Sequence, residues 1–122
     1  METNCKELIA KSEANWSLAL GLKDDGQYNA AANRFYYSVF QIVKVYAIKI
    51  GEMTLEEQTG VHAKARNIVR KDDKKLGRIY GTAEEIRVTA DYLLEDVSKN
   101  DLDSTFVKDI QDLRDHYKKL VA

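Results

Sequence analysis

Apolar residues recur every three or four positions along most of the chain, which is the spacing that gathers side chains on one face of an α-helix. The clearest such stripe predicts a helix over residues 27–50, with Gly51 as its C-terminal stop. At roughly 100° per residue its members fall within an arc of about 120°. They are Tyr28, Ala31, Ala32, Phe35, Val39, Ile42, Val43, Tyr46 and Ile50. We therefore expect a long helix that packs this face into a helical core.

Weaker stripes predict the helices on either side of it. A helix over 5–20 is expected to stop at Gly21, just before the turn-forming residues 24–26. Segment 61–80 has a stripe that is interrupted by charged residues at 71–75, and it predicts a short helix, a bend and one further turn. Neither segment shows β-branched runs bounded by turns, so no strand is predicted.

Two more helices complete the chain. Residues 82–85, Thr-Ala-Glu-Glu, form a capping-box pattern that predicts a helix from there to about residue 97. The last helix, over about 106–120, has apolar residues at spacings of 4, 3, 4 and 3, and Asp101 or Ser104 is expected to cap it. Together the elements predict an all-α fold, an antiparallel four-helix bundle in which one broken helix gives four to five helices.

The composition agrees with this fold and narrows the function. A chain of 122 residues predicts a single domain over 1–122, and the absence of proline argues against an all-β fold. No apolar run reaches the roughly 18 residues that span a bilayer, and the first residues lack a signal-peptide pattern, so we expect a cytoplasmic protein without a membrane partner. One cysteine, two histidines and the lack of a P-loop or a dinucleotide glycine motif predict no metal and no cofactor.

The predicted helix over 27–50 carries a second distinctive face, opposite its core stripe. The residues of this face are Ala30, Arg34, Tyr37, Gln41, Lys44, Val45 and Ile48. Arg34 and Gln41 are seven positions apart and therefore point within about 20° of each other. A solvated face would not carry Val45 and Ile48, so this face is expected to be covered. It either forms a symmetric dimer contact, which is the simpler interpretation, or meets other helices of the same bundle.

Three short motifs carry a resemblance to a known family. Residues 33–40, Asn-Arg-Phe-Tyr-Tyr-Ser-Val-Phe, match an NR-x-YY-x-x-F core. Residues 59–62, Thr-Gly-Val-His, stand where a Thr-His pair is common, and residues 87–92, Arg-Val-Thr-Ala-Asp-Tyr, match R-x-x-A-D-Y. In this order the motifs resemble HEPN domains, in particular a prokaryotic branch of that family, over about residues 5–121.

The resemblance implies a four- or five-helix bundle that forms a homodimer. Many HEPN domains are metal-independent endoribonucleases, often toxins paired with a small nucleotidyltransferase antitoxin. Their active motif is an Arg followed, after four to six residues, by a His, and two copies face each other across the dimer cleft. The Arg position maps to Arg34, whereas the His position maps to Gln41. The chain thus departs from the motif at its most reactive residue.

Gln41 changes the chemistry that the resemblance implies. Metal-free RNA cleavage needs a group that moves the proton of the 2′-hydroxyl or protonates the leaving oxygen, and an imidazole that titrates near neutral pH does either. A Gln amide only donates and accepts hydrogen bonds, and losing general acid–base catalysis typically costs roughly 10²–10⁴-fold in rate. Arg34 keeps the charge and the fork that bind phosphate. We therefore expect a domain that binds RNA or a nucleotide, with weak or absent ribonuclease activity.

His62 is a candidate replacement for the missing imidazole. It lies beside the apolar stripe of its predicted helix, where a lone His is more often structural; contact with the ligand and rescue of the acid–base step are the alternatives.

Arg87 and Asp91 have the i, i+4 spacing of a helical ion pair, and Tyr92 is expected to join their network. This network either organises the bundle or takes part in the cleft.

Charge is uneven along the chain. Residues 64–78 carry seven bases against two acids, whereas residues 82–115 carry ten acids against four bases. The basic segment is either a solvated face or a contact for phosphate groups. The side chains expected to bind RNA or a nucleotide are Asn33, Arg34, Tyr37, Lys44, Arg66 and Arg70. Two alternative functions stay open: an active ribonuclease toxin that uses another base, and an interaction module whose acidic face binds a nucleotidyltransferase partner.

Overall fold

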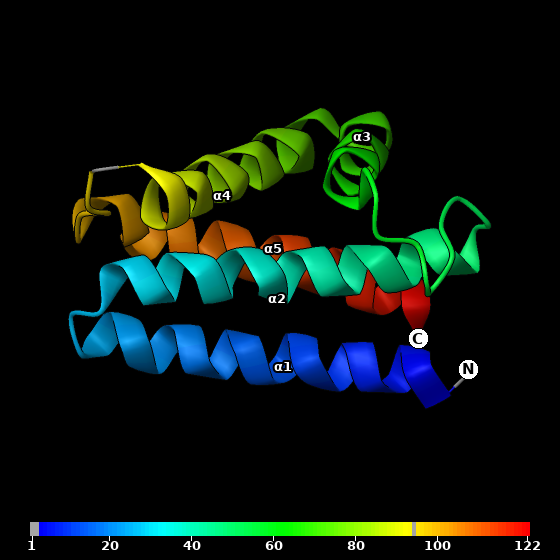
Figure 1. Ribbon diagram of the computed structural model, residues 1–122, viewed down its shortest axis with the longest axis horizontal. Helices are drawn as coiled ribbons and strands as arrows, with labels where there is room; N and C mark the ends of the chain where they lie inside the picture. Colours follow the sequence, from blue (N-terminus) through cyan, green and yellow to red (C-terminus); the bar gives the residue numbers. More distant parts are fainter. Residues whose placement is uncertain (1–2, 94) are drawn as a thin grey trace.

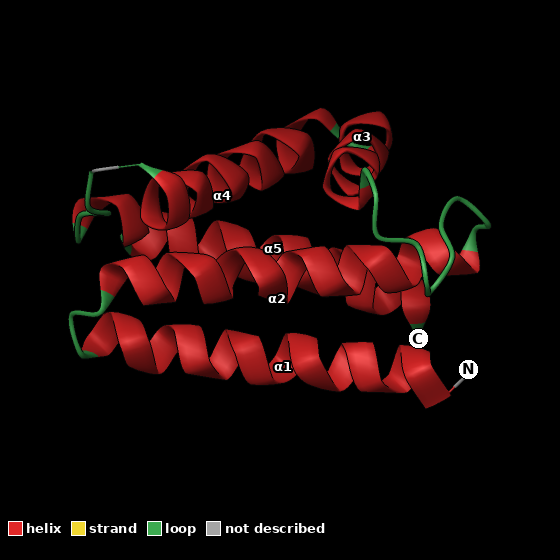
Figure 2. Ribbon diagram, viewed as in Figure 1, coloured by secondary structure: helices red, strands yellow, loops and turns green. Residues whose placement is uncertain are grey.

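The computed structural model describes residues 3–93 and 95–122, and within these residues α-helices form a bundle without strands (Figure 1, Figure 2). The elements are α1 (Thr3–Asp24), α2 (Tyr28–Lys49), α3 (Val61–Asp72), α4 (Lys74–Tyr92), the short 3₁₀ helix η1 (Asn100–Leu102) and α5 (Ser104–Val121). α1 and α4 run antiparallel to α2 and α5, and α3 lies across one end of the bundle (Figure 1). The predicted all-α fold is confirmed.

α2 is the central helix, because it contacts each of the other four α-helices. Its buried residues are Ala31, Ala32, Phe35, Tyr36, Ser38, Val39, Phe40, Ile42, Val43, Val45 and Ala47. They include most of the predicted core stripe and five positions outside it. Within that stripe Tyr28 and Tyr46 are half-buried, whereas Ile50 is 47% exposed because it lies beyond the end of the helix. α2 is therefore buried over more of its circumference than its sequence pattern predicts.

Two glycines in the left-handed conformation end α1 and α2. Gly51 has a φ of +79°, and the N–H groups of Gly51 and Glu52 donate to carbonyls in the last turn of α2 at 3.2 and 2.9 Å. The predicted stop of this helix is confirmed. Gly26, with a φ of +77°, ends α1 in the same way, so α1 continues through Gly21, where the prediction was wrong. A glycine inside a helix costs only about 1 kcal/mol, whereas a positive φ strongly favours glycine.

The start of α4 differs from the prediction. α4 begins at Lys74 rather than at Thr82, because the carboxylate of Asp73 accepts a hydrogen bond from the N–H of Leu76 at 2.9 Å and caps the helix. The break predicted at 71–75 is present, but it separates two full helices. The capping-box pattern at Thr82 lies inside α4 and caps nothing.

The ends of the last two helices differ as well. α4 ends at Tyr92, so Val97, expected on the helix, is buried from the following loop. α5 is capped by Asp103, which accepts from the N–H of Phe106 at 2.9 Å, and not by Asp101 or Ser104. Each correction moves a helix boundary and leaves the order of the helices unchanged.

A buried arginine joins the first and last helices. Arg114 of α5 is 2% exposed, and its Nη2 donates to Ser12 Oγ at 3.2 Å and to Glu13 Oε1 at 3.0 Å on α1. Its guanidinium lies 5.2 Å from the ring centroid of Trp16. Lys118 reaches the same carboxylate at 2.8 Å, and the hydrogen bond from Lys118 together with the charge of Arg114 holds the pKa of Glu13 below its ordinary value. These contacts fix α1 against α5.

Candidate functional site

The least buried side of α2 forms a stripe between α1 on one side and α3 and α4 on the other, with α5 behind (Figure 1). We call this surface the α2 stripe. Its residues are Ala30, Arg34, Tyr37, Gln41, Lys44 and Ile48, of which the first two are exposed and the others half-buried. Val45, which was predicted for the same face, is fully buried within the protomer. Val45 is therefore covered by other helices of the same bundle, which is one of the two interpretations of this face. Ala30 and Arg34 are not covered within the protomer.

Asn15 of α1 links the two motif positions on the stripe. Its Nδ2 donates to Gln41 Oε1 at 2.9 Å, and its Oδ1 accepts from Arg34 Nη1 at 3.3 Å. Arg34 and Gln41 thus share one partner, as their spacing on the helix allows. The sequence analysis missed Asn15, whose only signal is an amide next to the half-buried Trp16. In this trio the two groups beside Arg34 are neutral amides.

His62 lies in a partly buried aromatic cluster between α2, α3 and α4. Its Nδ1 is 2.6 Å from the hydroxyl oxygen of Tyr36, which is 3.1 Å from that of Tyr80, and its ring stacks on Phe40 with centroids 4.4 Å apart. Burial and the positive charge of Arg87 lower the pKa of His62. Burial also raises the pKa of the Tyr36 hydroxyl. The geometry favours a neutral, structural imidazole whose Nδ1 already has a partner.

Arg87 is the centre of a second network beside the α2 stripe. Its Nη2 donates to the hydroxyls of Tyr37 at 3.1 Å and Tyr92 at 3.3 Å, and its Nε lies 3.0 Å from Asp91 Oδ2 as an ion pair. The same carboxylate oxygen accepts from Asn33 Nδ2 at 2.9 Å. The predicted network of Arg87, Asp91 and Tyr92 is therefore present. It ties α4 to α2 and reaches the stripe through Tyr37, so it organises the bundle and borders the candidate site.

The chain matches the model of the HEPN domain family over residues 5–120. It belongs to the HEPN family. The match covers nearly the whole chain and agrees with the helical fold, and it marks a helical domain of a nucleotide- and RNA-related family whose members often dimerise. No curated protein matches the chain.

The remaining candidate cations of this HEPN domain lie in two places. Lys44 is half-buried on the α2 stripe. Arg66 of α3 donates to Glu84 of α4 at 2.8 Å, and this bond raises the pKa of Arg66. Arg70 lines a cavity between α3 and α4. Of the predicted binding residues, the structure thus gathers Arg34, Tyr37 and Lys44 on one surface and leaves Arg66 and Arg70 facing α4.

The chemistry available on the α2 stripe of this HEPN domain is hydrogen bonding and positive charge. Arg34 and Lys44 attract phosphate, and Tyr37 and Gln41 hydrogen-bond. Among the described residues, no three His, Cys, Asp or Glu side chains are grouped so that they could hold a metal ion. No helix in the described ranges is long and apolar enough to cross a membrane.

Proposed function

We propose that this HEPN domain binds RNA or a nucleotide along the α2 stripe and cleaves RNA weakly or not at all. The observation that carries the proposal is the hydrogen bond from Asn15 to Gln41 at 2.9 Å. At the position of the motif His stands an amide whose oxygen accepts from another amide, and neither group takes up a proton near neutral pH. The roughly 10²–10⁴-fold contribution of general acid–base catalysis is therefore missing from this position.

Arg34 supports the binding half of the proposal. It is exposed, and in the described part of the chain it forms no ion pair. Its hydrogen bond to the neutral carbonyl of Asn15 is long, at 3.3 Å. A phosphate would accept shorter, charge-assisted and bidentate hydrogen bonds from the other N–H groups of this guanidinium, while Asn15 keeps its contact with Nη1. Lys44 adds a second positive charge on the same side of α2.

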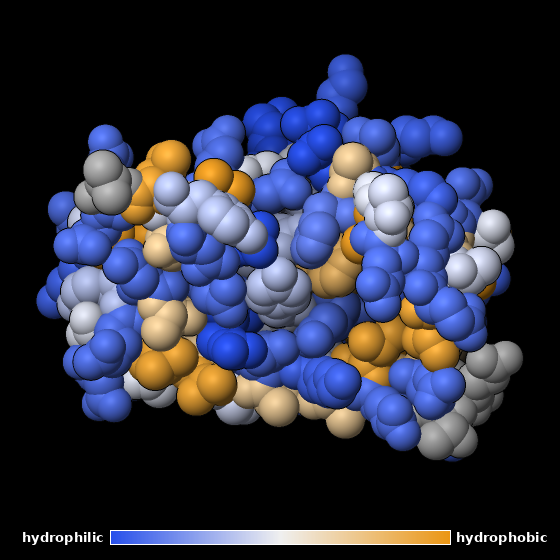
Figure 3. Space-filling model, in the orientation of Figure 1, coloured by the Kyte–Doolittle hydropathy of each residue, from blue (hydrophilic) through white to orange (hydrophobic). Residues whose placement is uncertain are grey.

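The proposed binding unit is a homodimer in which the α2 stripes of two copies face each other. Leu18, one turn after Asn15 on α1, is 48% exposed, and Ala30 is exposed on α2. Figure 3 shows hydrophobic side chains toward both ends of this face of the molecule and hydrophilic side chains between them. Such a face suits a two-fold contact that closes at its ends and leaves a polar cleft in the middle, where two Arg34 side chains meet one phosphodiester.

Metal-free cleavage of RNA in the presence of EDTA tests the proposal. The starting protein is expected to bind RNA in fluorescence anisotropy without cutting it, whereas Gln41→His is expected to gain cleavage. Arg34→Ala should weaken binding by about tenfold, since a charged hydrogen bond is lost, and Lys119→Ala, which removes an exposed lysine of α5, is the matched control. Robust cleavage by the starting protein that Arg34→Ala abolishes would overturn the proposal.

Two measurements separate the two alternatives. Cleavage by the starting protein that is lost in a folded His62→Ala variant would identify an active ribonuclease that uses His62. Capture of a nucleotidyltransferase without RNA binding at low salt would identify an interaction module. The acidic segment is less suited to this role than its sequence suggests, because Glu84 and Asp91 are already paired with Arg66 and Arg87.

A further inference from the structure

The outer face of α4, turned away from the core, carries unpaired charges of both signs. Lys74 and Arg78 lie in the first two turns of the helix, Glu85 lies further along, and all three are exposed. None of them forms an ion pair within the described residues. The neighbouring Glu84, by contrast, is paired with Arg66. The protomer therefore leaves these three charges available to a partner.

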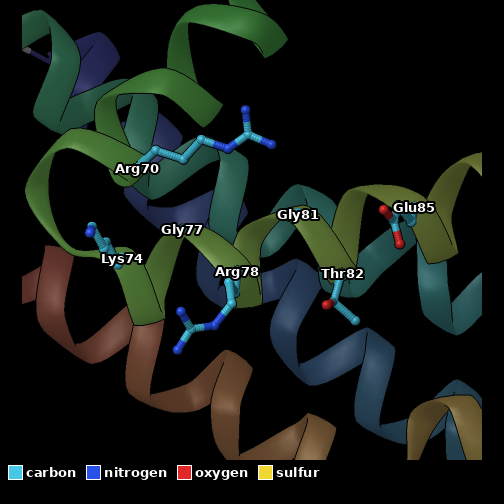
Figure 4. A pocket seen from close by; sticks show the side chains of 7 residues that line it. All are labelled: Arg70, Lys74, Gly77, Arg78, Gly81, Thr82 and Glu85. Atoms are coloured by element: carbon cyan, nitrogen blue, oxygen red, sulfur yellow. The ribbon is translucent and has the colours of Figure 1, made fainter.

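Arg78 and Glu85 lie symmetrically about the middle of this face. They are seven positions apart, so their side chains leave the helix within about 20° of each other. The midpoint falls between Gly81 and Thr82, about 5 Å along the helix axis from either charged residue. Figure 4 shows these residues following one another along α4. A two-fold axis through the midpoint would run a second α4 antiparallel to the first and would bring Arg78 opposite Glu85 twice.

Gly81 leaves room for this approach. A Cβ at position 81 would meet no atom within 4 Å, so packing within the protomer does not require a glycine there, although glycine weakens a helix. An open hollow of about 580 Å³ lies along this part of α4, and both Gly81 and Glu85 line it (Figure 4). The long side chain of Arg78 from a second copy would cross Gly81 and reach Glu85 through this hollow.

The C-terminal half of the same face exposes apolar surface. Val88 is 36% exposed and Tyr92 is 69% exposed. In the antiparallel arrangement, Lys75 and Lys74 of the second copy would lie opposite Val88 and Thr89, less than one helical turn from Tyr92. Lysine stems cover apolar surface, and their ammonium groups are attracted to the faces of aromatic rings. The basic start of one α4 thus fits the acidic and apolar end of the other.

We propose that the outer face of α4 is a self-association surface, on which a second copy of this chain packs its own α4 antiparallel across Gly81. The occupant is a second copy because the face is complementary to itself: each half carries the charges that the other half binds. None of its residues belongs to the α2 stripe, so this inference does not rest on the proposed function. Where copies also pair through the α2 stripe, the α4 contact would join these pairs into larger assemblies.

Charge reversal at Arg78 and Glu85 tests the proposal. One helix per copy gives a small interface, so self-association is measured by sedimentation velocity over a range of protein concentrations. Arg78→Glu and Glu85→Arg should each raise the Kd of self-association by about tenfold, because like charges then meet twice. The double variant and an equimolar mixture of the two single variants should recover the starting affinity, since opposite charges meet again. Lys119→Glu, at an exposed position on α5, is the matched control and should leave the Kd unchanged.

A disulfide across the two-fold axis tests the geometry. Cys5 is the only cysteine and is buried, so Thr82→Cys in a Cys5→Ser background carries a single exposed thiol. Two such thiols beside the axis lie close enough to bond, so oxidation should give a covalent dimer. Lys119→Cys in the same background is the control and should stay monomeric on denaturing gels.

Three results would overturn the proposal. The first is a Kd that is the same in the starting protein, Arg78→Glu and Glu85→Arg, and the second is a loss in these variants that neither the double variant nor the mixture recovers. The third is equal cross-linking from positions 82 and 119. Weaker RNA binding by Arg78→Glu with unchanged sedimentation would also contradict it and would assign this face to RNA. The sedimentation and cross-linking experiments contain no RNA, so their failure leaves the proposed function of the α2 stripe untouched.

Discussion

The Nδ1 atom of His62 lies 2.6 Å from the hydroxyl oxygen of Tyr36, inside the aromatic cluster between α2, α3 and α4. Burial is the main cause that lowers the pKa of His62 from its ordinary value of 6.5, and the charges of Arg87 and Lys44 add to it, whereas Glu84 opposes it. The folded protein therefore holds this imidazole neutral under conditions in which the unfolded chain would protonate it.

The stability of the domain should fall on acidification partly because of this imidazole. Since the folded pKa of His62 lies below 6.5, the unfolded state binds more protons as the pH falls through 6.5, and the contribution of His62 to stability is lost there. Urea unfolding at about pH 7 and about pH 5 should show a smaller pH dependence for His62→Gln than for the starting protein. His116→Gln, at an exposed position on α5, serves as the control. An unchanged pH dependence in His62→Gln would contradict the assignment.

Arg87 and Lys108 each form an i, i+4 ion pair, but the two pairs should differ in their contribution to stability. The Arg87 side chain is 15% exposed and also donates to Tyr37 and Tyr92, whereas the Lys108 side chain is 73% exposed. Arg87→Lys keeps the charge but loses the fork, so the free energy of unfolding should fall by about 1–3 kcal/mol. Lys108→Ala should change it little, because exposed pairs contribute little. Similar losses of stability in Arg87→Lys and Lys108→Ala, measured by thermal unfolding, would contradict this prediction.

Gly77 and Gly81 provide a second matched pair. Gly77→Ala places a Cβ within 2.9 Å of backbone in α3 and should destabilise the domain by about 1–3 kcal/mol. Gly81→Ala meets open space and should stabilise α4 by up to about 1 kcal/mol, which corresponds to a rise in Tm of a few degrees. A lower Tm in both variants would show that position 81 is also packed.

Asn15→Ala tests the link between α1 and the α2 stripe. The change removes the partner of Gln41 and Arg34, so both side chains become more mobile. Ordering Arg34 on a ligand should then cost more, and RNA affinity measured by fluorescence anisotropy should fall by about threefold. Asn67→Ala, at an exposed position on α3, is the control. Tighter binding by Asn15→Ala would mean that Asn15 competes with the ligand instead of positioning Arg34.

The helices could be predicted because each is encoded by its own periodicity. α2 follows the predicted range within one residue at each end, since both its apolar stripe and Gly51 are local signals. The start of α4 was missed for a local reason too. The residue types of a capping box also occur inside helices, so the pattern at Thr82 does not mark a helix start. Asp73 is identified as the cap of α4 only by the hydrogen bond that it accepts from the N–H of Leu76.

The candidate site could be predicted only where it lies on one helix. Arg34 and Gln41 share a face because they are two turns apart, and the pairing of Arg87 with Asp91 follows from the i, i+4 spacing. The contacts between different helices leave no comparable spacing pattern in the sequence. Asn15 and Gln41 are 26 residues apart in the chain, and Arg87 and Tyr37 are 50 apart, so their contacts depend on how the helices pack.

The central position of α2 also bears on how such a protein can evolve. The side chains that hold this helix in place point inward, while position 41 is half-buried at its border with α1. The Asn15 amide beside it both donates and accepts hydrogen bonds, so it can serve a glutamine or an imidazole equally well. Under the proposed function, a single replacement at this position would silence or restore ribonuclease activity, while the architecture around it is inherited unchanged.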